Sequence, residues 1–385
     1  MIYIDYFSSV NIVNNIAKYT GGTNYVRNII RLVSETKKEK LCILIPNEKS
    51  IIDDVSRLEN DYTAIKVIDS LESVDYSEVR VLFLPQVNGS VLKQAYNIKR
   101  KNDNLKIYGT LHDKQHNCFK YDFYNRFYFE KLKDKLKDFV LFYLKKIYLN
   151  LNYSKWISGV DKIFTVSNFS LQNLINKNVK YINYYIQNDY TSLVSEKNDE
   201  TCEKKNYILM VGAGRTEKNA LRTLEAFCKF HLENSSSKVK LIMTGVSPDL
   251  IKLFIKSKKV SEDLLDKYVV NKGYVSYDEL NRLYMSCKYV VFTSKAEGFG
   301  LPVLEAIKRN KLVLASYATS IPEVAGACMY YVNPYNVDSI KDGFKHLEND
   351  IEREKLEKYI EIKKDILEKQ IKLDEKLLIS ELLSD

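Results

Sequence analysis

The chain has 385 residues, 45% of them hydrophobic, and this length exceeds what one ordinary hydrophobic core holds. Its formal charge of +9 is a small excess among 28% charged residues of both signs, which excludes a basic tail. The excess favours an anionic partner without identifying it, and we expect no nucleic acid among the partners.

Short β-rich runs alternate with longer amphipathic runs through the first half of the chain. The runs are MIYIDYF (1–7), LCILIP (41–46), VRVLFLP (79–85), KIYGTLH (106–112) and KIFTVS (162–167). Such alternation predicts a parallel sheet wrapped by helices. The first run lacks a positive flank and contains Asp5, so it is unlike a signal peptide, and we expect a cytoplasmic protein.

Polar residues follow two of these predicted strands. Gly21 and Gly22 come after the first strand, where paired glycines suit either an ordinary turn or a binding cleft. His112 and Asp113 end the fourth strand, where a histidine suits either a backbone hydrogen bond or an active site. His116 follows at the spacing of a metal pair, but a third ligand is lacking, so we expect no metal.

The segment 121–152 has the apolar period of a helix and carries seven lysines and arginines. Its apolar stripe consists of Tyr128, Leu132, Leu136, Phe139, Tyr143, Ile147 and Leu151. One interpretation packs this stripe on the sheet, while acidic residues balance some of the lysines. The other places its aromatic and basic face on an anionic membrane surface. The apolar run FVLFYL (139–144) ends at Lys145 and Lys146, so it is too short to span a bilayer.

The second half of the chain repeats the alternation after a polar stretch at 188–206, which we interpret as a linker. Its β-rich runs are YILMVGAG (207–214), KVKLIMTG (238–245), KYVVFTS (288–294) and KLVLAS (311–316). Two Rossmann-like units in tandem are therefore predicted, with ligands bound beyond the carboxyl ends of the strands. We place the domains at 1–190 and 191–365, followed by a helix at 366–385 that returns to the first domain.

Six cysteines are scattered along the chain without a Cys-x-x-Cys motif: Cys42, Cys118, Cys202, Cys228, Cys287 and Cys328. Their irregular spacing predicts reduced, buried thiols.

The stretch SKAEGFGLPVLE (294–305) places two carboxylates on either side of a glycine-rich turn. It joins a predicted strand to a helix whose first turn suits Pro302. Glu297 is then a loop residue and Glu305 lies in the first turn of the helix. Carboxylates suit the paired hydroxyls of a sugar or ribose, although a helix cap and a solvated loop residue are the simpler interpretation.

This stretch resembles the E-G-F-G-L-P-x-x-E-A donor-site signature of the family 4 retaining nucleotide-sugar glycosyltransferases. Three further segments resemble motifs of the same family in the same order: VGAGRTEKN (211–219), GYVSYDEL (273–280) and TSIPEV (319–324). The first domain matches more loosely, through TGGTNYVR (20–27), His112-Asp113 and VSNFS (166–170). Two departures are Ala213, where many relatives have arginine, and Asn310, where glycine is usual.

The resemblance implies an α/β fold of the GT-B type, with two Rossmann-like domains facing each other across a cleft. It implies transfer of a sugar, with retention, from a nucleoside diphosphate donor to a saccharide or lipid-linked saccharide acceptor in cell-surface polysaccharide assembly. The enzyme would need no metal or cofactor, and would be cytoplasmic or peripheral on the inner face of the membrane.

The resemblance also assigns roles to individual residues. Glu297 would hold the sugar and Glu305 the ribose, Lys218 and Arg215 would meet the diphosphate, and His112 or Asp113 would lie near the reacting centre. The remaining donor-side residues are Gly212, Tyr274, Val275, Gly298, Phe299, Gly300 and Leu301, and Gly21 and Gly22 belong to the acceptor side. Two alternatives stay open: a nucleotide-sugar epimerase of the same architecture, and a non-catalytic, basic surface-binding protein.

Overall fold

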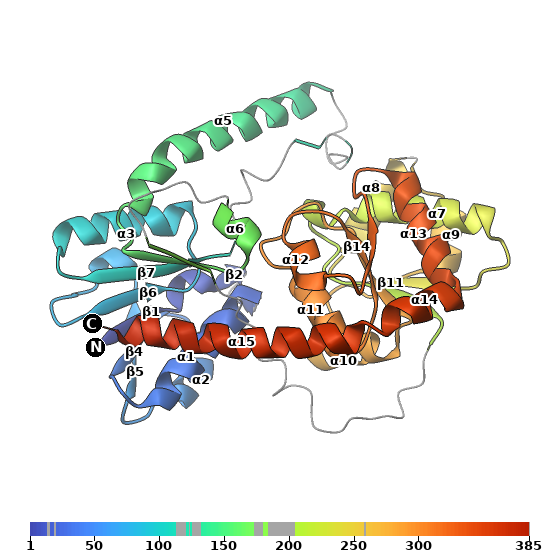
Figure 1. Ribbon diagram of the computed structural model, residues 1–385. Helices are drawn as coiled ribbons and strands as arrows, with labels where there is room; N and C mark the ends of the chain where they lie inside the picture. The colour runs from blue at the N-terminus through green and yellow to red at the C-terminus, as the bar shows by residue number, and fades with distance from the viewer. Residues whose placement is uncertain are drawn as a thin grey trace. The chain divides into compact units, whose positions relative to one another are not determined.

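The computed structural model describes residues 1–13, 16–18, 21–112, 121–122, 124, 132–172, 180–183, 205–257 and 259–384. The chain divides into two compact units, each built around its own parallel sheet (Figure 1). Unit 1 comprises Met1–Lys114, Leu144–Tyr190 and Lys369–Asp385, and unit 2 comprises Gln115–Tyr143 and Thr191–Glu368. Residues 188–204 of the predicted linker lie outside the described residues, and only 205 and 206 are described.

Unit 1 contains a seven-stranded sheet in its described part, in the order β5-β4-β1-β6-β7-β8-β9. The strands are β1 (Ile2–Asp5), β4 (Leu41–Pro46), β5 (Thr63–Ile68), β6 (Val81–Leu84), β7 (Lys106–Leu111), β8 (Lys162–Thr165) and β9 (Lys180–Asn183), with a separate hairpin of β2 (Asn11–Val13) and β3 (Ile16–Lys18). The helices are η1 (Phe7–Ser9), α1 (Gly21–Thr36), α2 (Lys49–Val55), η2 (Ser56–Leu58), η3 (Leu71–Ser73), α3 (Gly89–Lys101) and α6 (Asn168–Gln172). All neighbouring strands of the sheet run parallel.

Helices cover both faces of this sheet, which explains why its central strands are apolar runs without polar alternation. In β6, Val81 and Phe83 face a core that includes α1 and α2. Leu82 and Leu84 face the opposite core, which includes α3. Successive side chains of a strand point to opposite faces, so a doubly covered strand buries every residue.

Unit 2 contains a six-stranded parallel sheet among its described residues, in the order β12-β11-β10-β13-β14-β15. The strands are β10 (Tyr207–Met210), β11 (Lys240–Met243), β12 (Val269–Asn271), β13 (Tyr289–Phe292), β14 (Val313–Ser316) and β15 (Tyr330–Val332). The helices are η5 (Thr216–Lys218), α7 (Ala220–Glu233), α8 (Pro248–Lys256), α9 (Glu262–Tyr268), α10 (Tyr277–Ser286), α11 (Leu301–Lys308), α12 (Ile321–Ala325), α13 (Val337–Glu348) and α14 (Asp350–Glu357).

Both sheets have the strand order of a Rossmann fold when the strands are numbered along the chain, 3-2-1-4-5-6, with one further strand at the end of the first sheet. The predicted α/β fold with two Rossmann-like units is therefore confirmed. The nine β-rich runs each contain an observed strand, whereas β2, β3, β5, β9, β12 and β15 were not predicted. The last four lie at sheet edges, where shorter or partly exposed strands lose the continuous apolar pattern.

Two long helices contain residues of both units, α5 (Leu132–Ile157) and α15 (Ile360–Leu383). In unit 1, Leu378 and Leu382 of α15 pack in the core that contains α1. The last turn of α5 packs in the opposite core through Tyr153, Trp156 and Ile157.

Much of the predicted apolar stripe of α5 is exposed. Leu136, Ile147 and Leu151 are 50%, 54% and 75% exposed, so the interpretation as a core face is wrong for these residues. Phe139 and Tyr143, by contrast, are partly buried, and the Phe139 ring lies 5.2 Å from that of Tyr121. Among the described helices, none is long and apolar enough to cross a membrane.

Candidate active site

The centre of the unit 2 sheet brings together two turns that carry sequence-predicted site residues. β10 and β13 are neighbours, and the chain order of the strands reverses between them. In such sheets, the connections that leave the two central strands in opposite directions open a crevice at their carboxyl ends. The chain after β10 leads to Gly212 and Lys218, and the chain after β13 leads to Glu297.

The turn after β10 requires glycine for two different reasons. Gly212 has φ +63°, and a Cβ there would meet nothing within 4 Å, so this residue borders open space. A Cβ at Gly214 would instead overlap the carbonyl oxygen of Gly245, which lies in the turn after β11. The turns after β10 and β11 are therefore in close contact. The first of them leads into η5, whose last residue is Lys218.

Lys218 and Glu297 form an ion pair, with 2.7 Å between Nζ and Oε1. Both side chains are largely buried, 6% and 12% exposed. The Ser294 hydroxyl donates to the same Oε1 at 2.5 Å, and the Lys218 ammonium lies 4.6 Å from the ring centre of Phe292. The structure thus brings together two residues that are 79 positions apart in the sequence.

The backbone of the Glu297 loop is held by the TSIPEV segment. The Glu297 N–H donates to the Thr319 hydroxyl at 3.0 Å, and the Ser320 hydroxyl donates to the Glu297 carbonyl at 3.0 Å. Thr319 itself has φ +52°, an uncommon conformation for a β-branched residue that tertiary contacts must maintain. The TSIPEV segment therefore holds the backbone of Glu297 in place.

Glu305 is buried on α11, where the Tyr284 hydroxyl of α10 donates to its Oε2 at 2.6 Å. Gly300, with φ +101°, precedes the helix and allows the sharp entry into its first turn. The first turn of α11 contains no acidic residue, so the prediction that Glu305 lies there is wrong. The simpler interpretation of a helix cap is wrong as well, because the cap residue is Gly300 and no side chain caps it. Asn310, just beyond this helix, has φ +54°, which suits the position of a usual glycine.

The other predicted donor-side residues differ in exposure. Arg215 is 61% exposed and pairs with Glu217, with 3.0 Å between Nε and Oε1. Tyr274 is 82% exposed. Gly298 and Phe299 are buried, while Val275 and Leu301 are partly buried.

A buried cluster beside the Glu297 loop was missed by sequence reasoning. Asp122 accepts two hydrogen bonds from the Arg222 guanidinium, at 2.7 and 3.0 Å, and one from Lys295 at 2.8 Å. Burial by itself would raise the pKa of Asp122. The hydrogen bonds from Arg222 and Lys295 outweigh burial and hold this pKa well below its ordinary value. Arg222 belongs to α7, which follows η5, and Lys295 precedes Glu297 by two residues, so Asp122 links α7 to the loop that carries Glu297.

In unit 1, His112 lies at the end of β7 with Nε2 2.9 Å from the Pro85 carbonyl oxygen. Burial lowers its pKa to about 4, so the imidazole is neutral at physiological pH. Asp113 lies outside the described residues. Gly21 begins α1, and a Cβ at Gly22 would lie 2.8 Å from the end of the flexible Gln86 side chain, which would have to shift to admit it.

No group of three or more His, Cys, Asp and Glu residues in the described part of the chain is arranged to hold a metal ion. The four cysteines that can be described, Cys42, Cys228, Cys287 and Cys328, are buried and free.

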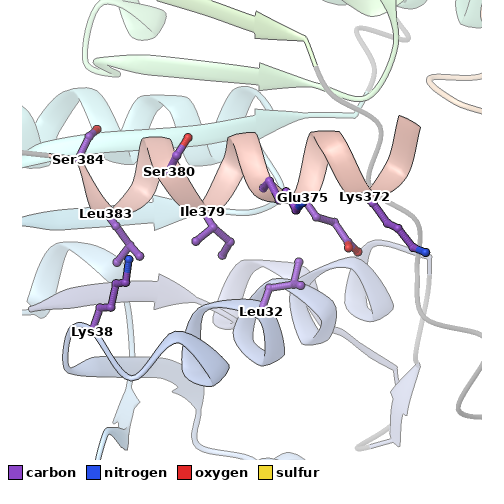
Figure 2. Close-up of a pocket in the computed structure, with 9 residues that line it drawn as sticks. Leu32, Lys38, Lys372, Glu375, Ile379, Ser380, Leu383 and Ser384 are labelled. Atoms are coloured by element: carbon purple, nitrogen blue, oxygen red, sulfur yellow. The ribbon is translucent and has the colours of Figure 1, made fainter. Parts of the chain in front are cut away.

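One described pocket lies away from these residues, between α1 and α15 of unit 1 (Figure 2). Its volume is about 560 Å³. Leu32 of α1 and Ile379 and Leu383 of α15 point towards one another across it, and Lys38 and Lys372 lie at its ends. It contains none of the sequence-predicted site residues.

Comparison with known proteins gives a family and several structural neighbours. Residues 194–365 match the family described as glycosyl transferases group 1. The O-antigen chain mannosyltransferase RfbU of Salmonella typhimurium is 29% identical over 206 residues, which cover 54% of this chain and 56% of that protein. The O-antigen chain mannosyltransferase B of Escherichia coli is 26% identical over 212 residues, covering 53% and 54%. The chain thus spans about half the length of the curated relatives it matches.

Two solved structures share the fold over nearly the whole chain. A glycosyltransferase from Rickettsia africae ESF-5 has a TM-score of 0.67 at 16% identity, covering 100% of this chain and 98% of that one. Anabaena Alr3699/HepE, solved in complex with UDP and glucose, has a TM-score of 0.66 at 12% identity, covering 99% and 98%.

Proposed function

We propose that this chain, whose residues 194–365 match the group 1 glycosyl transferases, moves a sugar from a nucleoside diphosphate donor to a saccharide acceptor. The family match supports the resemblance inferred from the motifs. The observation that carries the proposal is the Lys218–Glu297 pair at the carboxyl ends of β10 and β13, where a Rossmann sheet binds its ligand. Because two matched relatives are O-antigen mannosyltransferases, we propose polysaccharide assembly as the process and GDP-mannose as the first donor to test.

In this proposal, each residue acts through its own chemistry. The Lys218 ammonium stabilises the diphosphate as it leaves, Glu297 accepts a hydroxyl of the transferred sugar, and Glu305 accepts a ribose hydroxyl. Catalysis then consists of positioning and charge stabilisation, with retention at the anomeric carbon and without a metal. Neutral His112, on the acceptor side, donates through Nε2 to the Pro85 carbonyl, so its Nδ1 can accept a hydrogen bond from a sugar hydroxyl without adding charge.

The test has a binding arm and a transfer arm. A panel of nucleotide sugars is first screened by thermal stabilisation, since a ligand at 100 times its Kd adds about 2.7 kcal/mol. Transfer from the best ligand to lipid-linked saccharides is then measured for the parent and for Lys218→Ala and Glu297→Ala, in which it should be lost.

A product whose sugar is altered but not transferred would identify the enzyme as an epimerase. Failure to bind any nucleotide sugar would favour a non-catalytic surface-binding protein.

We also propose an anionic membrane surface as a partner of α5. Five exposed residues lie along one stripe of this helix: Leu136, Val140, Leu144, Ile147 and Leu151. Lysines accompany the stripe, including exposed Lys145 beside Leu144. An exposed apolar stripe with basic neighbours suits the boundary between headgroups and acyl chains, where lipid-linked acceptors are found.

Sedimentation with phosphatidylglycerol vesicles tests this partner. Replacing Lys145 and Lys146 by Glu should weaken binding, because each basic residue near such a surface contributes about 1 kcal/mol. Phosphatidylcholine vesicles are the control for vesicle charge, and the double variant with Lys252 and Lys256 replaced by Glu, at exposed sites on α8, is the control for the net charge of the protein. Equal sedimentation of parent and variant, or none for the parent, would contradict the proposal.

A further inference from the structure

The Lys218 ammonium has an anionic partner within the protein itself. In the part of the chain that the structure describes, its hydrogen-bond partner is Glu297 Oε1, at 2.7 Å. The ammonium is otherwise enclosed, with a side chain that is 6% exposed and the Phe292 ring 4.6 Å away. An approaching diphosphate therefore meets a neutral ion pair and not a free cation.

The two oxygens of Glu297 are in different situations. Oε1 accepts hydrogen bonds from both Lys218 and Ser294. Oε2 makes no hydrogen bond with any described residue, and the carboxylate keeps some solvent exposure, at 12%. The carboxylate can thus take a hydroxyl on Oε2 while Ser294 still holds Oε1.

We propose that Glu297 is an internal counterion of Lys218, which a bare nucleoside diphosphate must displace or share, whereas an intact nucleotide sugar compensates Glu297 with a sugar hydroxyl. This inference rests on the proposed function of the site. The negative charge of Glu297 opposes that of the diphosphate at short range, and the ion pair competes for the same ammonium. The competition with Glu297 lowers the affinity for both ligands. For the nucleotide sugar, the hydrogen bond from the sugar hydroxyl to Glu297 offsets this loss.

The consequence concerns the end of the reaction. Once the sugar has been transferred, the nucleoside diphosphate loses the group that occupied Glu297, and the carboxylate can return to Lys218. The pair then assists release of the product. If Lys218 were free of Glu297 for about 10% of the time, the apparent affinity for the bare nucleotide would be reduced about tenfold.

Calorimetry in EDTA with UDP, GDP, UDP-glucose and GDP-mannose tests the inference on the parent and on Glu297→Gln. This substitution keeps the size of the side chain but removes its charge. We expect the nucleoside diphosphate that the parent binds to bind about threefold to tenfold more tightly to the variant. The ratio of its Kd to that of the matching nucleotide sugar should fall, whereas general damage to the site would raise both Kd values.

Glu348→Gln is the control, because Glu348 forms a partly buried pair with Lys288 at 2.9 Å in unit 2 but outside the site. It should leave all four affinities unchanged. Unchanged or weaker nucleoside diphosphate binding by Glu297→Gln would overturn the inference.

A second measurement separates this inference from the proposed function. Acetylation of Lys218, followed by mass spectrometry, should be several-fold faster in Glu297→Gln than in the parent, because the amine has lost its partner. Equal rates would overturn the counterion role. If neither nucleotide binds the parent but Lys218 reacts faster in the variant, the pairing stands and the proposed nucleotide-sugar function fails.

Discussion

At the scale of single residues, Asp5 is a carboxylate at the carboxyl end of β1 that is almost completely buried. Its Oδ1 accepts a hydrogen bond from the Ser8 N–H at 2.9 Å, but its Oδ2 has no hydrogen-bond partner. Burial raises the pKa of Asp5 to about 6, from an ordinary value of 3.8. The folded chain therefore holds this proton more tightly than the unfolded chain, and the ionised group costs stability.

Asp5→Asn should stabilise unit 1 by about 1–3 kcal/mol at pH 8, where the parent carries a buried charge. The gain should shrink as the pH falls from 6 towards 4 and vanish below that, because the parent then becomes neutral in both states. Urea denaturation followed by fluorescence measures this, since the single tryptophan, Trp156, is buried in unit 1. An equal gain at pH 4 and pH 8 would contradict an electrostatic origin.

At the scale of elements, Asp122 joins α7 to the loop between β13 and α11. Its partners Arg222 and Lys295 are both largely buried, with side chains 8% and 5% exposed. Burial lowers the pKa of Lys295, and the hydrogen bond to Asp122 opposes this. Without the carboxylate, two buried cations would face each other with no anion between them.

Asp122→Asn should therefore destabilise unit 2 by roughly 3–5 kcal/mol, the usual cost of removing one partner of a buried pair. Faster hydrogen exchange in α7 and in residues 293–300 would report the loss. The matched control is Asp249→Asn, whose carboxylate is 88% exposed and 3.5 Å from Lys252, and which should cost no more than about 1 kcal/mol. Adding Lys295→Met should recover part of the loss, and no recovery would contradict the explanation by unpaired charge.

At the scale of the whole molecule, the resemblance to a metal-independent family leads to a prediction about chelation. Transfer should continue at an unchanged rate in EDTA, because Lys218 and backbone N–H groups supply the charge that stabilises the leaving diphosphate. The measurement is the initial rate of sugar transfer with and without the chelator. Loss of transfer in EDTA and its return with Mg²⁺ or Mn²⁺ would show that the chemistry depends on a metal.

The local signals in the sequence were sufficient to predict the fold and to select candidate site residues. Continuous apolar runs such as LCILIP mark strands that are buried on both faces, and this pattern survives any tertiary context. The EGFGLP stretch combines strand, glycine turn and helix start within a few residues, so Glu297 and Glu305 could be selected without knowledge of their partners. Edge strands such as β5 were missed because half-exposed positions tolerate polar residues.

Contacts between distant parts of the chain were decided by tertiary structure. Asp122 and Arg222 are 100 residues apart, and no period or motif indicates that a carboxylate from the first half of the chain lies between two cations of the second. Lys218 and Glu297 were each identified from sequence, but their pairing follows from the adjacency of β10 and β13, which strand order alone creates. The apolar stripe on α5 is a further example. The spacing of apolar residues in the sequence predicts which of them share a helix face, but only packing decides whether that face is covered.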